Sequence, residues 1–426
     1  MNVWIQNPFD NLPVEGYRKQ RFWLMAEAFA RAGHRVTLWT SDFNHMTKGL
    51  RALRGLRGLR GLSGERVAKG TYEVDGLSSK VLVQSLTSNV SRPVLAPSPG
   101  LELRLMPTRP YRKNVGLERV RSHREYARTW ERLARELVAE SNAETPNLII
   151  ASTPTVSGAE TAVRLARTFG AKVAVDVMDA WPETFERLAP KGLRWLARLA
   201  LTGLRRRAQR VYLAADFVSG VCERYRALTG RSDYYLAYHG IELEDGRRKT
   251  EDVGRKTEGG RLVYAGNLGR TYDLGTVIRG LKELNARLDV AGRGQGEAEW
   301  QALVKELGLE NRVTFHGYLG EGELARLLAS ADIGLVPMPS ESFVGVPYKF
   351  ADYAAAGLAI VSSLGGESAD LLARYRCGAG YAPGDVSSFV AAVRRVQAEG
   401  AGDVEGLRRL FDARRIYDAY VEWVTK

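Results

Sequence analysis

Cysteine is scarce in this chain of 426 residues, which contains only Cys222 and Cys377, far apart in the sequence. A disulfide framework and a structural zinc site are therefore not expected, and a reducing compartment such as the cytosol fits this composition. Histidine is also scarce. The five histidines, which never cluster at metal-ligand spacing, are His34, His45, His123, His239 and His316.

Long apolar runs are absent as well. No stretch of eighteen apolar residues occurs, so no helix is expected to span a membrane. The polar start MNVWIQNPFD is not that of a signal peptide. Fractions of 45% hydrophobic and 26% charged residues exclude extensive disorder and fibrous architectures. The length exceeds what one hydrophobic core usually organises, which predicts two domains.

Positive charge is concentrated in one half of the chain. Residues 1–240 carry 38 Lys and Arg against 22 Asp and Glu, whereas residues 241–426 carry 24 against 27. This asymmetry indicates that the first half faces an anionic partner. Three stretches, residues 48–69, 108–130 and 187–210, hold most of the excess.

A solvated connector separates the two halves, because residues 242–260 contain almost no apolar side chain. We therefore expect a first domain over 1–240, a linker over 241–260 and a second domain over 261–403. In the second domain, strands alternate with amphipathic helices, which predicts a parallel sheet covered on both faces. The expected strands are 261–266, 286–292, 311–317, 332–338 and 358–363, and the expected helices are 273–284, 295–308, 321–330, 346–356 and 385–399.

The first half repeats this pattern less regularly. Its expected strands are 3–6, 34–41, 80–86, 147–152, 171–177, 216–221 and 233–240, and its expected helices are 18–32, 118–140, 157–169 and 187–212. The fold class is thus α/β, with two Rossmann-like doubly wound domains facing each other across a cleft. Ligands of such sheets bind beyond the carboxyl ends of the strands.

Glycine-rich turns follow the first two strands of the second half. In residues 264–271 (YAGNLGRT), Gly266 and Gly269 would let backbone amides approach a phosphate, and Arg270 could pair with its oxygens. An ordinary strand–helix turn explains the segment equally well. Residues 291–296 (AGRGQG) match a dinucleotide fingerprint only weakly, so a simple glycine-rich turn is the better interpretation.

A third segment, residues 339–357 (PSESFVGVPYKFADYAAAG), leads from a polar loop into a helix. Lys349 and Asp352 share one helix face with Tyr353 and Ala356, where they could bind a phosphate and a ribose diol. A surface ion pair is the commoner explanation for such spacing. However, these are the only charges of an otherwise apolar helix, which favours a ligand role.

Two positions in the first half are candidates for the same site. Asp179 follows an expected strand in VMDAWPE, where it could orient a sugar or an acceptor hydroxyl. Capping of a helix ahead of Pro182 is an equally good explanation. Gly16, together with Arg18, could approach a pyrophosphate from the loop after the first strand.

Several motifs of the second half occur in the order and spacing of a known family. They are YAGNLG, AGRGQGE, VTFHGYLGEGELARLLASADIGLVPMPSESF and PYKFADYAAAGLAIVSS. Most of 261–400 thus resembles the nucleotide-sugar-binding domain of retaining GT-B glycosyltransferases of family 4, the group 1 transferases. The first half is similar in the Gly16 loop, AGHRVTLWTSDF, VDVMDAWPETF, LAADFVSGVCERYRALTG and YHGIELE. Within that family, the wording of these motifs is most similar to the branch that builds O-antigens, capsules and exopolysaccharides. The resemblance implies a nucleotide-sugar donor in the second domain, a saccharide acceptor in the first, and a terminal helix over 404–426 that crosses back to the first domain.

The sequence departs from the family at its charged positions. Of the family's paired glutamates, the second falls on Asp352 and the first on Val344, whose role would pass to Glu341 or to backbone amides of 343–345. The phosphate-clamping Arg and Lys fall on Asn267 and Tyr272. The resemblance leaves Arg270 and Lys349 to replace them, as catalytic residues with Asp179. Further donor contacts that it implies are Gly16, Gly266, Gly269, Thr271, Arg293, Tyr318, Ser342, Phe343 and Gly345.

No metal is expected in the reaction. The chain has no Asp-x-Asp triplet, which with the scattered histidines argues against a Mn²⁺-dependent GT-A transferase. In a GT-B enzyme, helix dipoles, backbone amides and Arg or Lys can stabilise the leaving diphosphate, so no cofactor is expected beside the donor. The family implies retention at the anomeric carbon. No nucleophilic carboxylate stands out, which favours front-face displacement in which the β-phosphate helps to deprotonate the acceptor.

The basic stretch 187–210 has eight cations and no acid, an apolar Leu face and Trp195 beside it. A cationic amphipathic helix with an interfacial Trp suits an anionic bilayer, although a domain-packing helix is the better explanation of this stretch alone. The three basic stretches together favour a cytoplasmic protein, peripheral on the inner face of the cytoplasmic membrane, with a polyprenyl-diphosphate-linked acceptor. The residues expected to contact acceptor or membrane are Arg112, Lys113, Arg194, Trp195 and Arg198.

Two other functions remain open from the sequence. A nucleotide-sugar epimerase of GT-B architecture would bind the same donor but would not need the basic first half. A nucleic-acid-binding protein could use that half as its footprint. No helix-turn-helix, zinc-finger or RRM signature supports the second alternative, so no nucleic-acid partner is expected.

Overall fold

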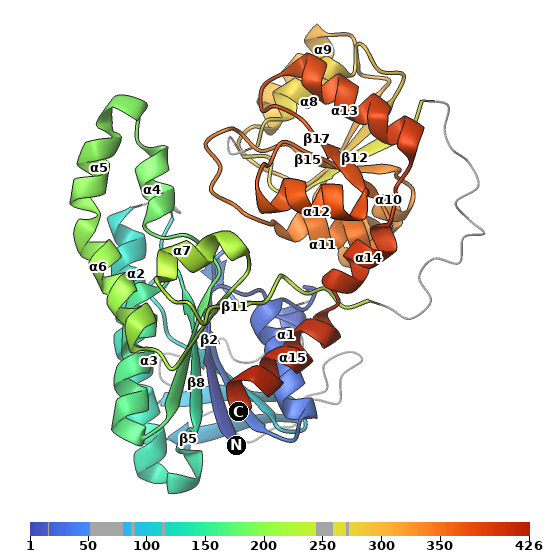
Figure 1. Cartoon of the computed structure of the whole chain (residues 1–426). Coiled ribbons are helices and arrows are strands. Elements are labelled where there is room, and N and C mark those ends of the chain that lie inside the picture. The colour runs from blue at the N-terminus through green and yellow to red at the C-terminus, as the bar shows by residue number, and fades with distance from the viewer. Residues whose placement is uncertain (16, 52–79, 87–89, 113–115, 244–258, 270–271) are drawn as a thin grey trace. The chain divides into compact units, whose positions relative to one another are not determined.

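The computed structural model describes residues 1–15, 17–51, 80–86, 90–112, 116–243, 259–269 and 272–426 (Figure 1). The chain forms two compact units. Unit 1 comprises Met1–Val221, Tyr225–Ala237 and Arg414–Lys426, and unit 2 comprises Cys222–Arg224 and Tyr238–Ala413. The main segment of unit 2 therefore begins at Tyr238, two positions before the end of the expected first domain at residue 240, and Cys222–Arg224 from within that domain also belongs to unit 2.

One mixed sheet organises unit 1. Its strands run in the order β11-β10-β9-β8-β1-β2-β7-β6-β5, with parallel pairing from β11 to β7 and antiparallel pairing of β6 with both its neighbours. The strands are β1 (Asn2–Gln6), β2 (Arg35–Ser41), β5 (Lys80–Leu86), β6 (Val90–Ser98), β7 (Leu101–Met106), β8 (Leu148–Thr153), β9 (Lys172–Val177), β10 (Phe217–Gly220) and β11 (Tyr235–Leu236). A small hairpin of β3 (Phe43–Asn44) and β4 (Gly49–Leu50) follows β2.

Helices cover both faces of this sheet. Figure 1 shows α2 (Leu117–Glu140), α3 (Val156–Phe169) and α6 (Thr202–Ala214) on one face and α1 (Arg21–Arg31) with α15 (Ala413–Thr425) on the other. The single helix expected over 187–212 is wrong. The chain forms α4 (Glu183–Leu188), a turn of 3-10 helix over Lys191–Leu193, α5 (Arg194–Ala200) and then α6. Pro190 cannot continue the hydrogen-bonding pattern of α4, which explains the first interruption.

The C-terminal segment divides between the units. The helix expected over 404–426 is two helices, α14 (Val404–Leu410) in unit 2 and α15, which packs in unit 1 from Arg414 onward. Tyr420 lies fully buried against Phe29 of α1, with ring centroids 6.5 Å apart. Trp423 stacks on Tyr235 of β11 at 4.5 Å. The aromatic side chains of α15 thus anchor the end of the chain to the sheet of unit 1.

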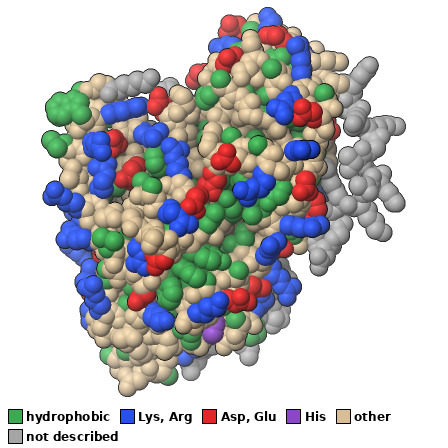
Figure 2. Space-filling model, viewed as in Figure 1, with side chains coloured by type: hydrophobic (Ala, Val, Ile, Leu, Met, Phe, Trp, Pro, Cys, Tyr) green, Lys and Arg blue, Asp and Glu red, His purple; other side chains and the backbone are tan. Residues whose placement is uncertain are grey.

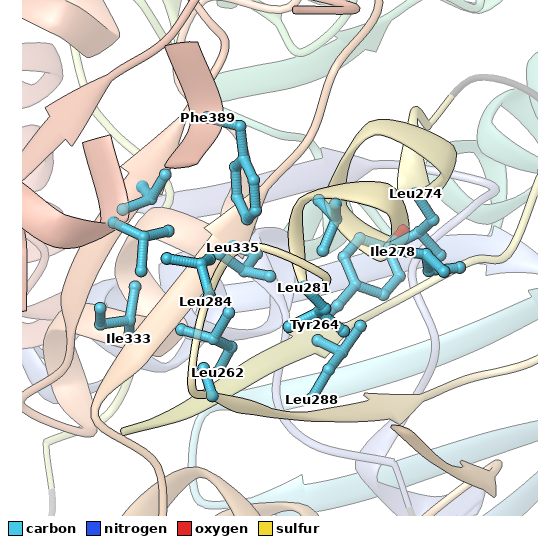
Figure 3. Close-up of a cluster of buried hydrophobic side chains, with 14 of the residues drawn as sticks. Leu262, Tyr264, Leu274, Ile278, Leu281, Leu284, Leu288, Ile333, Leu335 and Phe389 are labelled. Atoms are coloured by element: carbon cyan, nitrogen blue, oxygen red, sulfur yellow. The ribbon is translucent and has the colours of Figure 1, made fainter. Parts of the chain in front are cut away.

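Unit 2 contains a parallel sheet in the order β14-β13-β12-β15-β16-β17. Its strands are β12 (Arg261–Ala265), β13 (Arg287–Ala291), β14 (Val313–Gly317), β15 (Ile333–Val336), β16 (Ala359–Ser362) and β17 (Gly378–Gly380). The helices between them are α8 (Leu274–Gly280), α9 (Glu297–Glu306), α10 (Glu321–Ala329), α11 (Tyr348–Ala355), α12 (Glu367–Tyr375) and α13 (Val386–Glu399). Figure 3 shows how Leu262, Leu288 and Ile333 of the sheet pack with Ile278 of α8 and Phe389 of α13 in the core.

None of the helices in the described part of the chain combines the length and the apolar composition needed to cross a lipid bilayer.

Candidate functional site

Three loops meet at the carboxyl edge of the sheet of unit 2. The loop after β12 is tied to the loop after β13 by hydrogen bonds from the Gly266 amide to the Ala291 carbonyl (2.8 Å) and from the Leu268 amide to the Arg293 carbonyl (3.0 Å). The Gly292 amide donates to the carbonyl of Gly317, which ends β14, at 2.7 Å. These backbone contacts fix the floor of the candidate donor site.

Glycine is required where these loops touch. A Cβ on Gly292 would lie 1.8 Å from the Gly266 carbonyl oxygen, and Gly292 has a φ of +137°. Gly266 has a φ of +147°, which side-chain-bearing residues rarely adopt. Both glycine-rich turns of the sequence therefore serve close backbone approach, because the turn over 291–296 packs against residues 264–269.

Lys349 places its ammonium group directly against the first loop. Its side chain is buried, with Nζ 4.7 Å from the ring centroid of Tyr272 and 5.1 Å from that of Tyr264. A Cβ on Gly266 would lie 2.1 Å from this Nζ. The faces of both rings attract the cation. Burial raises the pKa of both phenols, so the rings stay neutral. Tyr272, where the resemblance expects a charged residue, thus helps to hold a cation supplied by α11.

Tyr353 fixes α11 over the sheet. Its hydroxyl accepts from the Ala265 amide and donates to the Leu335 carbonyl, both at 3.1 Å, so it joins β12 to β15. The ring fills the space above Gly334, where a Cβ would lie 2.3 Å from a ring carbon. The helix face that carries Lys349, Asp352 and Tyr353 therefore packs against the protein. Lys349 is buried, Tyr353 is fully buried and Asp352 is half-buried.

The loop before α11 is internally bonded. The Ser342 amide donates to the Pro339 carbonyl at 3.0 Å, and the Val344 amide approaches the Ser342 hydroxyl at 3.4 Å. The hydroxyl of Ser368, in the first turn of α12, donates to the Gly345 carbonyl at 2.5 Å. The Val344 amide, one of those expected to replace the missing glutamate, therefore has a partner within the loop. Glu341 is half-buried beside it.

Sequence reasoning missed a short segment from far upstream. The guanidinium of Arg224 lies 4.1 Å from the centroid of the Phe343 ring. The Glu223 amide donates to Glu367 at 2.8 Å, and the Tyr238 hydroxyl donates to the same carboxylate at 2.6 Å. Burial raises the pKa of Glu367. No local pattern identifies Cys222–Arg224 as part of this site, because its partners lie more than a hundred residues away.

Two expected donor contacts lie at the rim. Arg293, exposed after β13, brings its Nε to within 3.7 Å of the position of a Cβ on Gly317. Tyr318, directly after β14, is 62% exposed. Asn267 is exposed on the first loop, and its carbonyl accepts from the Tyr264 hydroxyl at 2.6 Å. Gly269 is half-buried at the end of this loop.

Four of the expected site residues lie outside the described part of the chain. They are Gly16, Lys113, Arg270 and Thr271.

In unit 1, Asp179 lies just beyond β9. Its carboxylate accepts from the Trp181 indole at 3.1 Å. The helix α4 begins after Pro182, which provides no side-chain cap. Burial raises the pKa of Asp179, and the hydrogen bond from Trp181 and the charge of Arg119 oppose this shift. Asp179 is thus a carboxyl group at a strand end with a perturbed protonation equilibrium.

Three of the four described residues expected at the acceptor or membrane are exposed. Arg112 is exposed next to Tyr111. Helix α5 contains no buried residue, and Trp195 and Leu199 are 64% and 70% exposed. Arg198 is exposed on the same helix, and Arg194 is half-buried. Figure 2 shows hydrophobic side chains among Lys and Arg at the upper left, over the helix labelled α5 in Figure 1.

Solved structures of glycosyltransferases share this architecture. Sucrose-phosphate synthase from Thermosynechococcus elongatus aligns with 100% of this chain and 98% of its own, with 13% identity and a TM-score of 0.64. Anabaena HepE in complex with UDP and glucose aligns with 100% of this chain and 99% of its own, with 13% identity and a TM-score of 0.62. WaaG, a glycosyltransferase involved in lipopolysaccharide biosynthesis, aligns with 99% of both chains, with 14% identity and a TM-score of 0.60. The expected fold is therefore confirmed as the α/β fold of GT-B glycosyltransferases, with a mainly parallel sheet in one domain and a parallel sheet in the other.

Sequence comparison points to unit 2 in particular. Residues 260–399 match the family model of group 1 glycosyl transferases. An uncharacterised glycosyltransferase of Methanocaldococcus jannaschii is 33% identical over 107 residues, which make up 25% of this chain and 26% of that protein. The alignment thus spans about a quarter of the length of this curated relative.

Proposed function

We propose that the protein is a retaining, metal-independent glycosyltransferase that moves a hexose or N-acetylhexosamine-type sugar from a nucleotide-diphosphate donor to a saccharide acceptor in cell-surface polysaccharide biosynthesis. The observation that carries this proposal is the position of the Lys349 ammonium, held by two tyrosine rings against the glycine loop at the carboxyl edge of the sheet. A fixed cation beside exposed backbone at this edge is suited to a diphosphate. The match of residues 260–399 to the family model and the similarity to HepE in complex with UDP and glucose support it.

Each side chain then has a role. Lys349 binds the diphosphate and stabilises the charge that develops on it as the glycosidic bond breaks. Asp352, on the same helix, accepts hydrogen bonds from the ribose diol. Arg270 adds a second cation to the phosphates. Asp179 orients the acceptor hydroxyl or the donor sugar. The β-phosphate helps to deprotonate that hydroxyl, and the new bond forms on the face from which the diphosphate leaves.

Calorimetric titration tests the donor site. UDP, GDP, dTDP and ADP are titrated in EDTA into the wild type, Lys349→Met and Asp352→Ala. One diphosphate is expected to bind without metal, about tenfold or more weakly in each variant, because each loses hydrogen bonds to a charged group. Arg326→Met, exposed on α10, provides a control within unit 2 and should bind like the wild type. Binding of none of the four diphosphates by the wild type would contradict the donor site.

The same proposal includes a membrane surface. Exposed Trp195 and Leu199 beside Arg194 and Arg198 suit insertion into the headgroup region of an anionic bilayer. We place the protein on the cytoplasmic face of the cytoplasmic membrane, where a polyprenyl-diphosphate-linked saccharide would be its acceptor. Sugar transfer to a lipid extract that depends on the donor, with no net epimerisation of the donor, distinguishes this activity from that of an epimerase.

A further inference from the structure

A carboxylate in the first turn of α12 joins two upstream segments of unit 2. One oxygen of Glu367 accepts from the Glu223 amide at 2.8 Å, and the other accepts from the Tyr238 hydroxyl at 2.6 Å. Both partners lie more than a hundred positions earlier in the chain and belong to unit 2. Three separate stretches of this unit therefore meet at one side chain.

The hydrogen bonds to Glu367 favour its ionised form. Burial raises the pKa of this half-buried carboxyl group, and the hydrogen bonds from the Tyr238 hydroxyl and from the backbone of Glu223 and Arg224 oppose the rise. Hydrogen bonds to an ionised acceptor are stronger than those between neutral groups. Glu367 is therefore a firm attachment point for both segments.

The first segment, residues 222–224, contacts the loop that precedes α11. The Arg224 guanidinium lies 4.1 Å from the centroid of the Phe343 ring. A Cβ on Gly345 would lie 2.6 Å from Sγ of Cys222, so only glycine lets the loop come this close to the segment. Residues 222–224 thus support the loop at two positions that the sequence assigns to the donor site.

The second segment, residues 238–239, contacts the start of α11. The His239 ring stacks on the Tyr348 ring, with centroids 3.7 Å apart and planes inclined by 24°. Tyr348 is the first residue of α11 and directly precedes Lys349. The hydrogen bond from Tyr238 to Glu367 therefore restrains the end of the same loop through the neighbouring His239.

The cation of the donor site is held by other contacts. The rings of Tyr264 and Tyr272 lie 5.1 Å and 4.7 Å from Nζ of Lys349, and the Tyr353 hydroxyl ties α11 to the sheet. None of these contacts involves Glu367 or the two segments attached to it. The position of Lys349 and the position of the loop are thus supported by different residues.

A donor bound as proposed would extend from α11 toward this loop. Its ribose would lie at Asp352 and its diphosphate at Lys349, which is about 4.5 Å nearer the start of the helix. The sugar, on the other side of the diphosphate from the ribose, would then point toward the residues before α11. Phe343 and Gly345 belong to those residues.

We propose that Glu367 is a positioning residue for the donor sugar, because it holds residues 222–224 and 238–239 against the loop that receives this sugar. It acts through the loop and does not touch the donor. The role in sugar binding rests on the proposed function, whereas the support of the loop depends on unit 2 alone.

Hydrogen exchange of the full chain without ligand tests the support of the loop. In Glu367→Gln, amides of residues 340–346 should exchange about tenfold faster or more, because the Gln side chain offers one acceptor oxygen in place of two and the loop opens more often. Exchange in residues 265–269 should stay the same. Asp370→Asn, exposed in the same first turn of α12, removes a charge at the same helix end and should change neither loop.

Calorimetry in EDTA tests the effect on the donor. UDP, GDP, dTDP and ADP are compared with UDP-glucose, GDP-mannose, dTDP-glucose and ADP-glucose. Glu367→Gln should weaken binding of the sugar nucleotide about tenfold or more, and that of its diphosphate less than about threefold, because Lys349 keeps its own supports. A variant that only destabilised unit 2 would weaken both alike. Tyr238→Phe, which removes one hydrogen bond to Glu367, should show the same pattern with a smaller factor.

Two results would overturn the inference. They are exchange of residues 340–346 in Glu367→Gln at the rate of the wild type, and equal weakening of a diphosphate and its sugar nucleotide. If Glu367→Gln fails to fold, Tyr238→Phe provides both measurements, since it removes a single oxygen atom.

Failure of the donor proposal gives a different result. Absence of diphosphate binding by the wild type, with faster exchange of residues 340–346 in Glu367→Gln, would remove the donor site and leave Glu367 only as a support of the loop. Diphosphate binding that depends on Lys349, with a loop that does not respond to Glu367→Gln, would keep the donor site and remove this inference.

Discussion

The ammonium group of Lys349 occupies the space in which Gly266 has no side chain. A Cβ at position 266 would lie 2.1 Å from Nζ and 3.0 Å from Cε of Lys349, closer than non-bonded atoms approach. The helix α11 and the loop after β12 are therefore matched to each other, although 83 positions separate the two residues. A flexible lysine end could shift to admit a methyl group, but it would then leave the two tyrosine rings that hold it.

Gly266→Ala is expected to impair diphosphate binding without unfolding unit 2. The new methyl group displaces the Lys349 ammonium and strains a backbone with φ of +147°, so UDP affinity should fall at least tenfold. Calorimetry in EDTA measures this change. In the control Gly322→Ala, the added Cβ meets nothing within 4 Å on helix α10, and UDP affinity should stay the same. Equal affinity of Gly266→Ala and the wild type would show that the Lys349 position does not matter for the donor.

The sequence predicted most of the fold because buried parallel strands are short apolar runs. NVWIQ, LIIAST and AIVS are fully buried, and all three were expected as strands. The strand LELRLM over Leu101–Met106 was missed, because its buried Arg104 breaks the apolar pattern. Arg104 is accommodated by the Trp39 ring, 5.6 Å away, and by an ion pair with Glu102. Such compensation depends on tertiary neighbours that a local pattern does not contain.

The candidate site was predictable only where its residues lie in motifs. Gly266 and Lys349 stand out by spacing and by an otherwise apolar helix, and the structure brings them together. Arg119 did not stand out, because it is one of many cations in the stretch 108–130 and its rings come from distant segments such as Phe9 and Trp181. Its orientation is a property of the folded sheet edge.

A buried ion pair in unit 1 provides a prediction about stability. Arg21 and Asp176 are both fully buried and joined by two hydrogen bonds of 2.7 Å, and Arg21 also donates to the Ala237 carbonyl. Asp176→Asn leaves a buried guanidinium without its counter-charge, which typically costs about 3–5 kcal/mol of unfolding free energy. Denaturant unfolding measures this loss.

A surface pair serves as its control. Arg395 and Glu399 are 2.9 Å apart with side chains more than half exposed, so Glu399→Gln should cost no more than about 1 kcal/mol. Similar losses in Asp176→Asn and Glu399→Gln would show that the buried pair is not a major contributor to the stability of unit 1.

His123 should make unit 1 sensitive to acid. Burial, followed by the charges of Arg119 and His45, lowers its pKa from 6.5 to about 3. The unfolded chain takes up a proton below pH 6.5 that the folded chain refuses, so stability falls as the pH drops from 6.5 toward 3. At pH 5 this effect amounts to roughly 2 kcal/mol for His123. Thermal melts of His123→Phe should lose less stability over this range than the wild type, although His45, whose pKa is also lowered to about 3, retains part of the slope. Parallel curves for the two proteins would contradict this assignment.

The exposed apolar side chains of α5 lead to a prediction for membrane binding. Trp195 and Leu199 are exposed on a helix that carries no acidic residue, so they can enter a bilayer while neighbouring arginines bind lipid phosphates. Trp195→Ser with Leu199→Ser should lower partitioning onto vesicles of phosphatidylglycerol and phosphatidylcholine about tenfold or more, since each buried apolar side chain contributes about 1.5–3 kcal/mol when fully inserted. Co-sedimentation measures this effect.

Leu213→Ser removes a side chain that is 58% exposed on α6 and should change little. High salt should weaken binding of the wild type, because attraction to the anionic lipid is screened. Equal partitioning of the double variant and the wild type would show that α5 does not insert, and the basic surface would then contact the acceptor alone.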